Sequence, residues 1–397
     1  MAAALLIGLA GSGYIARGFA LALQMAPDMR LASALTRRPV EHVTGFPEPE
    51  LLTNSIDQML DRCDLVVECS GDVVHATNVI DAAMRAGKPV VTMDAEFHVT
   101  AGSHYVDRGV MLTEAQGDQP GSLAAMAEEA RAMGFKVLVY GNRKGYYHPN
   151  PPRDQMEHWA EKQGQRIESI TGFTDGTKMQ IEQTLVANGL GATILRDGML
   201  GPTAASMEEG GQMLALEARA LGQPIADYAV VEGGPAGIFL ACEADPRQQP
   251  YLEYLKLGPG PNYVLVHNYH LCHLEMLQTI RRVRSGGPAL LTNSKSPTIS
   301  VAAIAKRDLR PGERIDKGIG SFEMRGEAVR IAHNPNHVPI GLVCDAVIRR
   351  RVAADQLLQM DDIDLADNLA TRAWLSTIRS LQDAKGKAPA RKEQFAV

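Results

Sequence analysis

Lys178 and Glu182 lie four residues apart in the segment FTDGTKMQIE, a spacing that places both side chains on one face of a helix. An ammonium beside a carboxylate can hold or move a proton at a reacting oxygen, although the same pair is also common as a plain surface ion pair. Asp175, just before the expected helix start, can act with them or can simply cap the helix. We therefore take all three as candidate catalytic residues.

Two further candidates come from other segments. Lys144 follows a predicted strand and suits a phosphate or a polyol, or is a solvated loop residue. His270 is the middle one of three histidines in VHNYHLCHLEM. These histidines recur every third residue, and such steps turn successive side chains by about 300° around a helix, so the three do not converge on one zinc ion. We expect His270 alone to point into the site.

A glycine-rich loop near the N-terminus indicates a cofactor. In LLIGLAGSGYIARGFALAL an apolar strand is followed by a tight turn and then an amphipathic helix, with Ala16 at the third glycine position of the fingerprint. Glycine allows the positive φ of such a turn, and the N–H groups at the helix start favour a pyrophosphate. The expected cofactor-binding residues of this loop are Gly11, Ser12, Gly13, Tyr14 and Ile15.

The next strand, 31–35, predicts which dinucleotide binds. It ends in Thr36, Arg37 and Arg38, with no carboxylate to accept from a ribose 2′-hydroxyl. Two guanidinium groups can hold a 2′-phosphate, which favours NADP(H), unless one or both are solvated turn residues. Three further contacts to the cofactor are expected at the ends of later strands, from Ser70, Gly71 and Glu96.

Alternating strands and helices must position these residues. Predicted strands at 64–70, 89–93, 109–114 and 136–141 alternate with helices at 72–86 and 122–133. This order predicts a doubly wound parallel sheet of about six strands, with ligands at its carboxyl edge. After the proline-rich segment HPNPPRD we expect a helix at 154–163, a strand at 167–173, a helix at 178–190, and β segments at 301–304 and 338–348.

The chain is thus predicted to be an α/β protein of several domains. A Rossmann-like NADP-binding domain covers residues 1–150, and a central α+β catalytic and dimerisation domain covers 151–295. A small β-rich domain with a C-terminal helix covers 296–383, and 384–397 forms a disordered tail. Because a central sheet with one exposed apolar face must be covered, we expect a homodimer or homotetramer.

The amino-acid composition limits the classes of binding partner that we expect. The 397 residues are 45% hydrophobic and 22% charged, as in globular proteins, and no apolar run reaches the roughly 18 residues of a membrane span. A net charge of −6 argues against nucleic acid and anionic lipid. Five scattered cysteines without a C-x-x-C motif indicate a reducing cytoplasm. The remaining partner is a small molecule, anionic or a polyol, met by a local basic pocket.

The motifs together resemble a known family. They are GDQPG at 117–121, FTDGTK at 173–178, NYHLCHLE at 268–275, AKRDLRPGERI at 305–315 and VPIGL at 338–342. This set resembles the homoserine-dehydrogenase-like oxidoreductases that carry a C-terminal SAF domain, a group that includes the deoxyxylulose-phosphate reductoisomerase-like enzymes. The resemblance implies that 296–383 is SAF-like. Relatives tend to read A-G-K where this chain has Gly141, Asn142, Arg143 and Lys144, which leaves the register of Lys144 open.

These observations predict an NADP-dependent oxidoreductase that acts on a small polyhydroxylated or phosphorylated carbonyl compound. The resemblance implies conversion of 1-deoxyxylulose 5-phosphate to 2-methylerythritol 4-phosphate. That reaction would use Mg²⁺ or Mn²⁺, for which Asp175, Glu182 and Glu275 are the available hard ligands. One alternative is a homoserine-dehydrogenase-type reduction of an amino-acid semialdehyde. An alternative of another class is a nucleotide or sugar sensor without catalysis.

Overall fold

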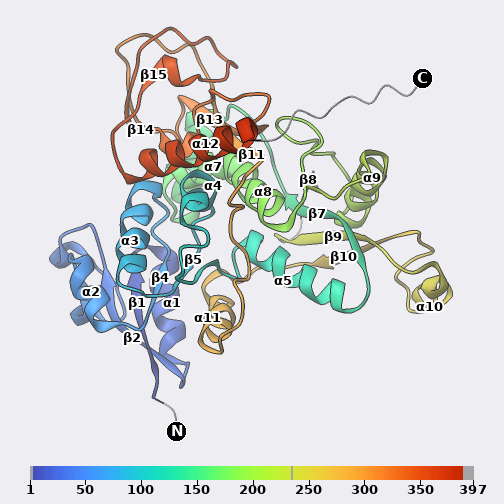
Figure 1. Ribbon diagram of the computed structural model, residues 1–397, viewed down its shortest axis with the longest axis horizontal. Coiled ribbons are helices and arrows are strands. Elements are labelled where there is room, and N and C mark those ends of the chain that lie inside the picture. The colour runs from blue at the N-terminus through green and yellow to red at the C-terminus, as the bar shows by residue number, and fades with distance from the viewer. Residues whose placement is uncertain (1–2, 234–235, 388–397) are drawn as a thin grey trace.

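The computed structural model describes residues 3–233 and 236–387, beginning with a six-stranded parallel sheet (Figure 1). Its order is β3-β2-β1-β4-β5-β6, and β1 pairs in parallel with both β2 and β4. The strands are β1 (Leu5–Ala10), β2 (Met29–Leu35), β3 (Leu52–Thr53), β4 (Leu65–Glu68), β5 (Val90–Thr92) and β6 (Leu112–Glu114). This is the strand order of dinucleotide-binding sheets, so the predicted Rossmann-like sheet is confirmed.

Helices cover both faces of this sheet. Alternate residues of β4 enter two different cores, since Leu65 packs on the side of α1 and Val66 on the side of α3. On the α1 side Phe19 is fully buried, as expected for the apolar side of the amphipathic helix predicted after the glycine-rich loop. The helices of this part are α1 (Tyr14–Gln24), α2 (Ile56–Arg62), α3 (Val73–Arg85), α4 (Ala95–Thr100) and α5 (Gln119–Ala132).

A second, mixed sheet follows in the order β10-β9-β7-β8. Its strands are β7 (Lys136–Lys144), β8 (Ile225–Val230), β9 (Ile238–Glu243) and β10 (Asn262–His267). The prediction that 136–141 extends the first sheet is wrong, because β7 pairs with β8 and with the buried apolar strand β9. The short strand β3 supplies the sixth position of the first sheet instead.

Helices also cover both faces of the second sheet. Residues of α9 (Met207–Leu221) pack on one face, whereas residues of α5 and α8 (Thr177–Leu190) pack on the other. The expectation of an exposed apolar face on this sheet is therefore wrong. The chain supplies the covering helices of both faces itself. The homodimer or homotetramer remains a prediction, but an uncovered sheet face no longer supports it.

The segment 167–173 is helical, not the predicted strand. It forms α7 (Ile167–Thr174), which lies beside α6 (Arg153–Gln163). Ile170 packs in a small core with Met156 and Ala160 of α6, and Ile167 lies against the same core. The apolar side chains thus follow a helical spacing that was mistaken for a short β run. The turn after α7 leads directly into α8, whose start agrees with the prediction.

The C-terminal part, residues 299–364, is called the β module here. It holds β11 (Ile299–Ala305), β12 (Arg314–Lys317), β13 (Met324–Arg330), β14 (Cys344–Ile348) and β15 (Ile363–Asp364). Its two sheets are β11-β13 and β12-β14-β15. The predicted β segment 338–348 is a strand only from Cys344 on, since a 3-10 turn precedes it. Helix α12 (Leu369–Lys387) follows and contains the first residues of the predicted disordered tail, while 388–397 lie outside the described residues.

After the second sheet, the chain runs back and packs against the first sheet. After β10, the segment through α11 (Met276–Arg284) packs against the α1 side of the first sheet, where Met276 and Ile280 are fully buried (Figure 1). The Gln116 N–H donates to Thr279 Oγ1 at 2.9 Å. The short helix α10 (Gln249–Tyr254) lies at the far end of the second sheet. In the described part of the chain no helix is long and apolar enough to cross a membrane.

Candidate active site

The glycine-rich loop has the geometry of a phosphate cradle. Gly11 has φ of 132°, and a Cβ there would lie 3.2 Å from the Cys69 carbonyl oxygen, so only glycine fits without strain. Gly13 caps α1 and is exposed. The first helical hydrogen bond runs from Arg17 N to Gly13 O, which leaves the N–H groups of Tyr14 and Ile15 at the open helix end. The loop can therefore receive a pyrophosphate.

The two arginines after β2 differ in their contacts. Arg38 donates from Nη2 to the carbonyl and the hydroxyl oxygen of Ser12, both at 3.0 Å, so it fastens the glycine-rich loop. Arg37 is half exposed and pairs with Asp72 at 2.9 Å. It lines a cavity of about 430 Å³ at the end of β2, together with Asn54 and His75. This cavity lies where an adenosine ribose binds in such sheets.

Acidic side chains line the carboxyl edge beyond the loop. Glu68 is fully buried at the end of β4 and accepts from the Ser70 N–H at 2.8 Å and from Thr92 Oγ1 at 3.1 Å. Burial raises the pKa of Glu68 to about 7. Gly71, the residue after Ser70, has a positive φ of 65° and open space around its Cα. The two predicted contacts at this turn thus lie beside the edge where a cofactor would pass.

Lys178 lies among three other acidic side chains, those of Glu96, Glu182 and Asp118. Its Nζ donates to Glu96 Oε1, and the side chains of Lys178 and Glu96 are 23% and 6% exposed. Burial works against the ammonium, but Glu96, Glu182 and Asp118 together raise the pKa of Lys178. The same pairing lowers the pKa of Glu96 against the effect of its burial. Lys178 therefore stays charged, and Glu96, predicted as a cofactor contact, is its ion-pair partner.

Glu182 holds its proton more tightly than an ordinary glutamate. Burial first, and the charge of Asp118 second, raise its pKa to about 8, although Lys178 opposes the shift. Its Oε2 accepts from Asn142 Nδ2 at 3.1 Å, and the same amide donates to Gln119 Oε1. Lys178 and Glu182 lie within α8 and share one helix face, as the spacing predicted.

His270 completes this group from the returning segment. Its Nε2 lies 3.3 Å from Gln119 Nε2, and its Nδ1 lies 3.2 Å from the Gly117 carbonyl oxygen. Gly117 has φ of 104°, and a Cβ there would lie 2.1 Å from the Cys272 carbonyl oxygen. This close approach of GDQPG to NYHLCHLE brings His270 to the Lys178 side. By contrast, His273 turns away, with its ring against Gly18 of α1.

The remaining two predicted catalytic residues, Lys144 and Asp175, lie near this group, but their polar atoms are engaged by other parts of the chain. Lys144 donates to the Phe173 carbonyl oxygen, and burial lowers its pKa although Glu182 and Asp175 oppose this. Asp175 is 1% exposed, and both of its carboxylate oxygens are engaged. Its Oδ1 accepts from the Thr177 N–H at 2.9 Å, and its Oδ2 accepts from Lys306 Nζ at 2.7 Å. The expected N-cap role is wrong in detail, because Gly176 is the N-cap of α8 and makes no side-chain capping bond, while Asp175 ends α7 and accepts from Thr177 across the turn.

The predicted metal ligands do not form one set. Asp175 is held by Lys306, and Glu275 accepts from the Leu271 N–H at 2.6 Å. Among the described residues no three histidine, cysteine or acidic side chains are arranged to hold a metal ion. The prediction of a metal site made of Asp175, Glu182 and Glu275 therefore disagrees with the geometry. Asp175 pairs with Lys306 of the β module, and Glu275 accepts from a backbone N–H.

Sequence reasoning missed several members of the site. Glu68 stands inside the apolar run DLVVECS, where an acid in a buried strand is itself a signal. Glu114 ends β6 in the same way and lies 3.4 Å from His98, with both side chains fully buried. Asp118 lies in the GDQPG motif, but only the fold shows that it influences Lys178. Asn142 had no signal, because its neighbour Glu182 is distant in sequence.

One comparison with known proteins covers part of the chain. Residues 117–276 match the family model described as the catalytic domain of oxidoreductase DRL. The matched segment contains Lys178, Glu182 and His270, and the dinucleotide-binding sheet precedes it. The chain is an NAD(P)-dependent oxidoreductase.

Similarity to other proteins is distant. No curated protein shows significant sequence similarity to the chain. A UDP-N-acetylglucosamine 3-dehydrogenase from Acidithiobacillus ferrooxidans is 14% identical, with a TM-score of 0.44, 73% of this chain covered and 92% of that one. A myo-inositol dehydrogenase from Corynebacterium glutamicum is also 14% identical, with a TM-score of 0.44, 72% of this chain covered and 90% of that one. These likenesses are too distant to bear on the substrate.

Proposed function

We propose that this protein is an NADP-dependent oxidoreductase that reduces or oxidises a small polyhydroxylated or phosphorylated carbonyl compound. The observation that carries the proposal is the Lys178 ammonium, held beside protonated Glu182 at the carboxyl edge of the dinucleotide-binding sheet. A bound nicotinamide would supply or accept the hydride. The protein residues then have to stabilise charge and move a proton at the carbonyl oxygen.

Lys178 and Glu182 divide this work. Lys178 keeps its proton because the Glu96 carboxylate pairs with it, so it serves as a fixed positive charge that stabilises a developing alkoxide. Glu182 has a pKa near the working pH, so it can deliver a proton to that oxygen and take it back in the reverse direction. Lys144 lies within electrostatic reach of Glu182, and His270 contacts Gln119, so we assign these two residues to the other oxygens or a phosphate of the substrate.

Preference for NADP(H) rests on Arg37. The chain has no carboxylate at the position that would accept from a ribose 2′-hydroxyl, and the half-exposed Arg37 lines the cavity at the end of β2. A 2′-phosphate there would exchange the Asp72 partner of Arg37 for a charge-assisted pair with the cofactor. Arg38 contributes indirectly by holding Ser12 and the loop.

For the substrate, we propose reductoisomerisation of 1-deoxyxylulose 5-phosphate, which rests on the family resemblance of the motifs. The same resemblance supports a SAF-like identity for the C-terminal part. No step is assigned to a metal ion, since the described residues form no ligand set for one. Reduction of an amino-acid semialdehyde remains the alternative activity.

The test is NADPH consumption with three substrates: the deoxyxylulose phosphate, an aspartate-type semialdehyde and a simple polyol or sugar acid in the reverse direction with NADP⁺. Each is assayed with and without Mg²⁺ or Mn²⁺. Turnover of the phosphate alone supports the reductoisomerase, and turnover of the semialdehyde alone replaces it. Tight NADPH binding without turnover of any member would support a sensor and contradict the proposal.

A further inference from the structure

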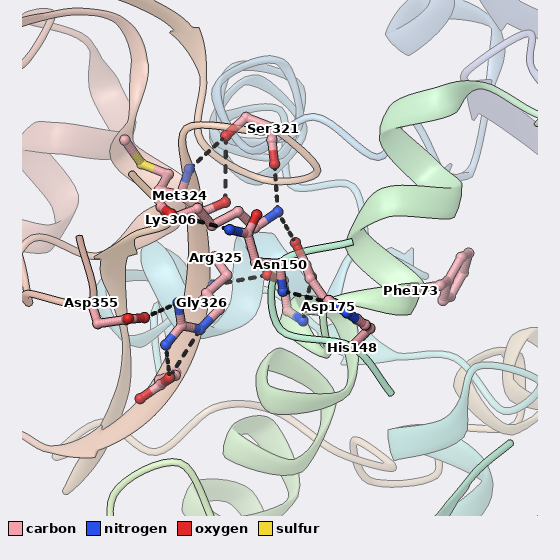
Figure 2. A network of polar contacts seen from close by, with 12 residues as sticks. His148, Asn150, Phe173, Asp175, Lys306, Ser321, Met324, Arg325, Gly326 and Asp355 are labelled. Carbon is pink, nitrogen blue, oxygen red and sulfur yellow. Dashed lines mark hydrogen bonds and ion pairs between the residues drawn. The ribbon is translucent and has the colours of Figure 1, made fainter. Parts of the chain in front are cut away.

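A fully buried ion pair joins the β module to the start of the catalytic helix α8. Lys306 of the β module and Asp175 have no exposed side-chain surface, and their charged atoms are 2.7 Å apart (Figure 2). Lys306 Nζ also donates to the Ser321 carbonyl oxygen at 2.6 Å. Since an unpaired charge in such a place is costly, the pair fixes the α7–α8 turn to two points of the β module.

The contacts continue along one side of α8. Thr177 Oγ1 accepts from the Gly326 N–H at 2.8 Å, and Gln180 Oε1 accepts from the Ala328 N–H at 2.9 Å. Both donors belong to β13, so one strand of the β module lies along the first turns of the helix. A Cβ at Gly326 would lie 3.0 Å from Thr177 Cγ2, which shows how closely strand and helix approach.

Lys178 and Glu182 lie on a different side of the same helix. At about 100° per residue, they are turned by roughly 100–160° from the side that β13 contacts. The β module thus holds the helix from one side while the reacting groups face Glu96 and Asn142 from another. A shift at the Asp175 turn would move Lys178 first, because it lies three residues further on.

We propose that Lys306 is a positioning residue for the reaction, acting through Asp175 to set the orientation of Lys178 and Glu182. This rests on the proposed function of that helix face. Asp175 then acts as the link, since neither of its oxygens is free to meet a substrate. The β module would thus contribute to the reaction by holding α8 in the orientation that Lys178 and Glu182 need.

The test compares four proteins: wild type, Lys306→Met, the double variant Asp175→Asn with Lys306→Met, and Asn188→Ala. The single Lys306 variant leaves a buried charge and can fail to fold, whereas the double variant removes both charges and keeps the size of the side chains. Asn188 is the matched control. It also binds the β module, through the Ile299 carbonyl oxygen at 2.9 Å, but about 15 Å further along the helix.

Two measurements separate positioning from stability. Amide hydrogen exchange of residues 177–182 needs no substrate, and we expect it to become at least tenfold faster in the double variant, with a melting temperature near wild type. With a substrate found active above, we expect kcat to fall about 10- to 100-fold while the KM for NADPH stays unchanged. The Asn188 variant should loosen only the far end of α8 and keep kcat.

Two outcomes for the double variant overturn the proposal. Wild-type exchange and kcat in the double variant would mean that the pair only avoids an unpaired charge. Wild-type exchange with a reduced kcat would mean that Asp175 meets the substrate directly. If the wild type turns over none of the substrates, the proposed function fails, and the exchange measurement alone still decides whether Lys306 fixes the helix.

Discussion

Two regions at one sheet edge use opposite physical means. The glycine-rich loop is open, and it offers backbone N–H groups at a helix end together with the half-exposed Arg37. The Lys178 group is largely buried, with the side chains of Lys178 and Glu96 only 23% and 6% exposed, and burial contributes to its pKa shifts. In the first region water competes with the ligand, so binding depends on shape and on a few contacts. In the second the low dielectric strengthens each charge, so small changes affect the chemistry strongly.

Glu182→Gln should separate the two regions most clearly. We expect kcat to fall about 10²- to 10⁴-fold, the usual range for loss of an acid–base group, with unchanged NADPH affinity. In the wild type, kcat in the reducing direction should fall as the pH rises through about 8, because Glu182 then loses its proton. Steady-state rates across pH check both points. Glu161→Gln, on an exposed part of α6, is the control and should be silent. An unchanged profile in Glu182→Gln would remove this residue from the reaction.

Arg37→Ala should affect only the open region. We expect NADPH binding to weaken by ~1–3 kcal/mol and NADH binding to stay nearly constant, because only the 2′-phosphate loses a charge-assisted partner. Arg38→Ala should weaken both cofactors, since it releases Ser12 and the loop. Titration calorimetry with both cofactors measures this. Equal losses for NADPH and NADH in Arg37→Ala would show that this side chain does not recognise the phosphate.

The buried region should give the smallest but most general effect, a pH dependence of stability. Glu68 and Glu182 bind protons more tightly in the folded chain, with pKa values of about 7 and 8 against 4.5 in the unfolded chain. Their contribution is therefore complete below pH 4.5 and is lost as the pH rises to about 8.

Chemical denaturation at several pH values checks this contribution. The loss of stability between pH 4.5 and 8 should become smaller in Glu68→Gln than in the wild type. Glu161→Gln again serves as the control. Equal slopes in all three proteins would mean that Glu68 is already ionised in the fold.

What could be predicted from the sequence follows the same division. The glycine-rich loop and the strands on either side of it are local features, so the positive φ at Gly11 followed from its place in the loop. The Lys178–Glu182 face was also local. By contrast, Glu68 and Asn142 join the site only because their strands pair within the folded sheets, and the order of the sequence does not reveal this. The pairing of β7 was mispredicted because a buried apolar strand looks the same in sequence whichever sheet it joins. The pairing of Asp175 with Lys306 joins positions that are remote in sequence, so no spacing rule finds it.

The most direct test of the central claim is single-turnover hydride transfer in Lys178→Met. The variant and the wild type are mixed in stopped flow with saturating NADPH, and the decay of the reduced nicotinamide is followed after addition of an active substrate. The account predicts the same NADPH affinity and fold, with transfer slowed about 10²- to 10⁴-fold, and little recovery in Lys178→Arg. Transfer at the wild-type rate in Lys178→Met would contradict it and would place the reacting carbonyl away from α8.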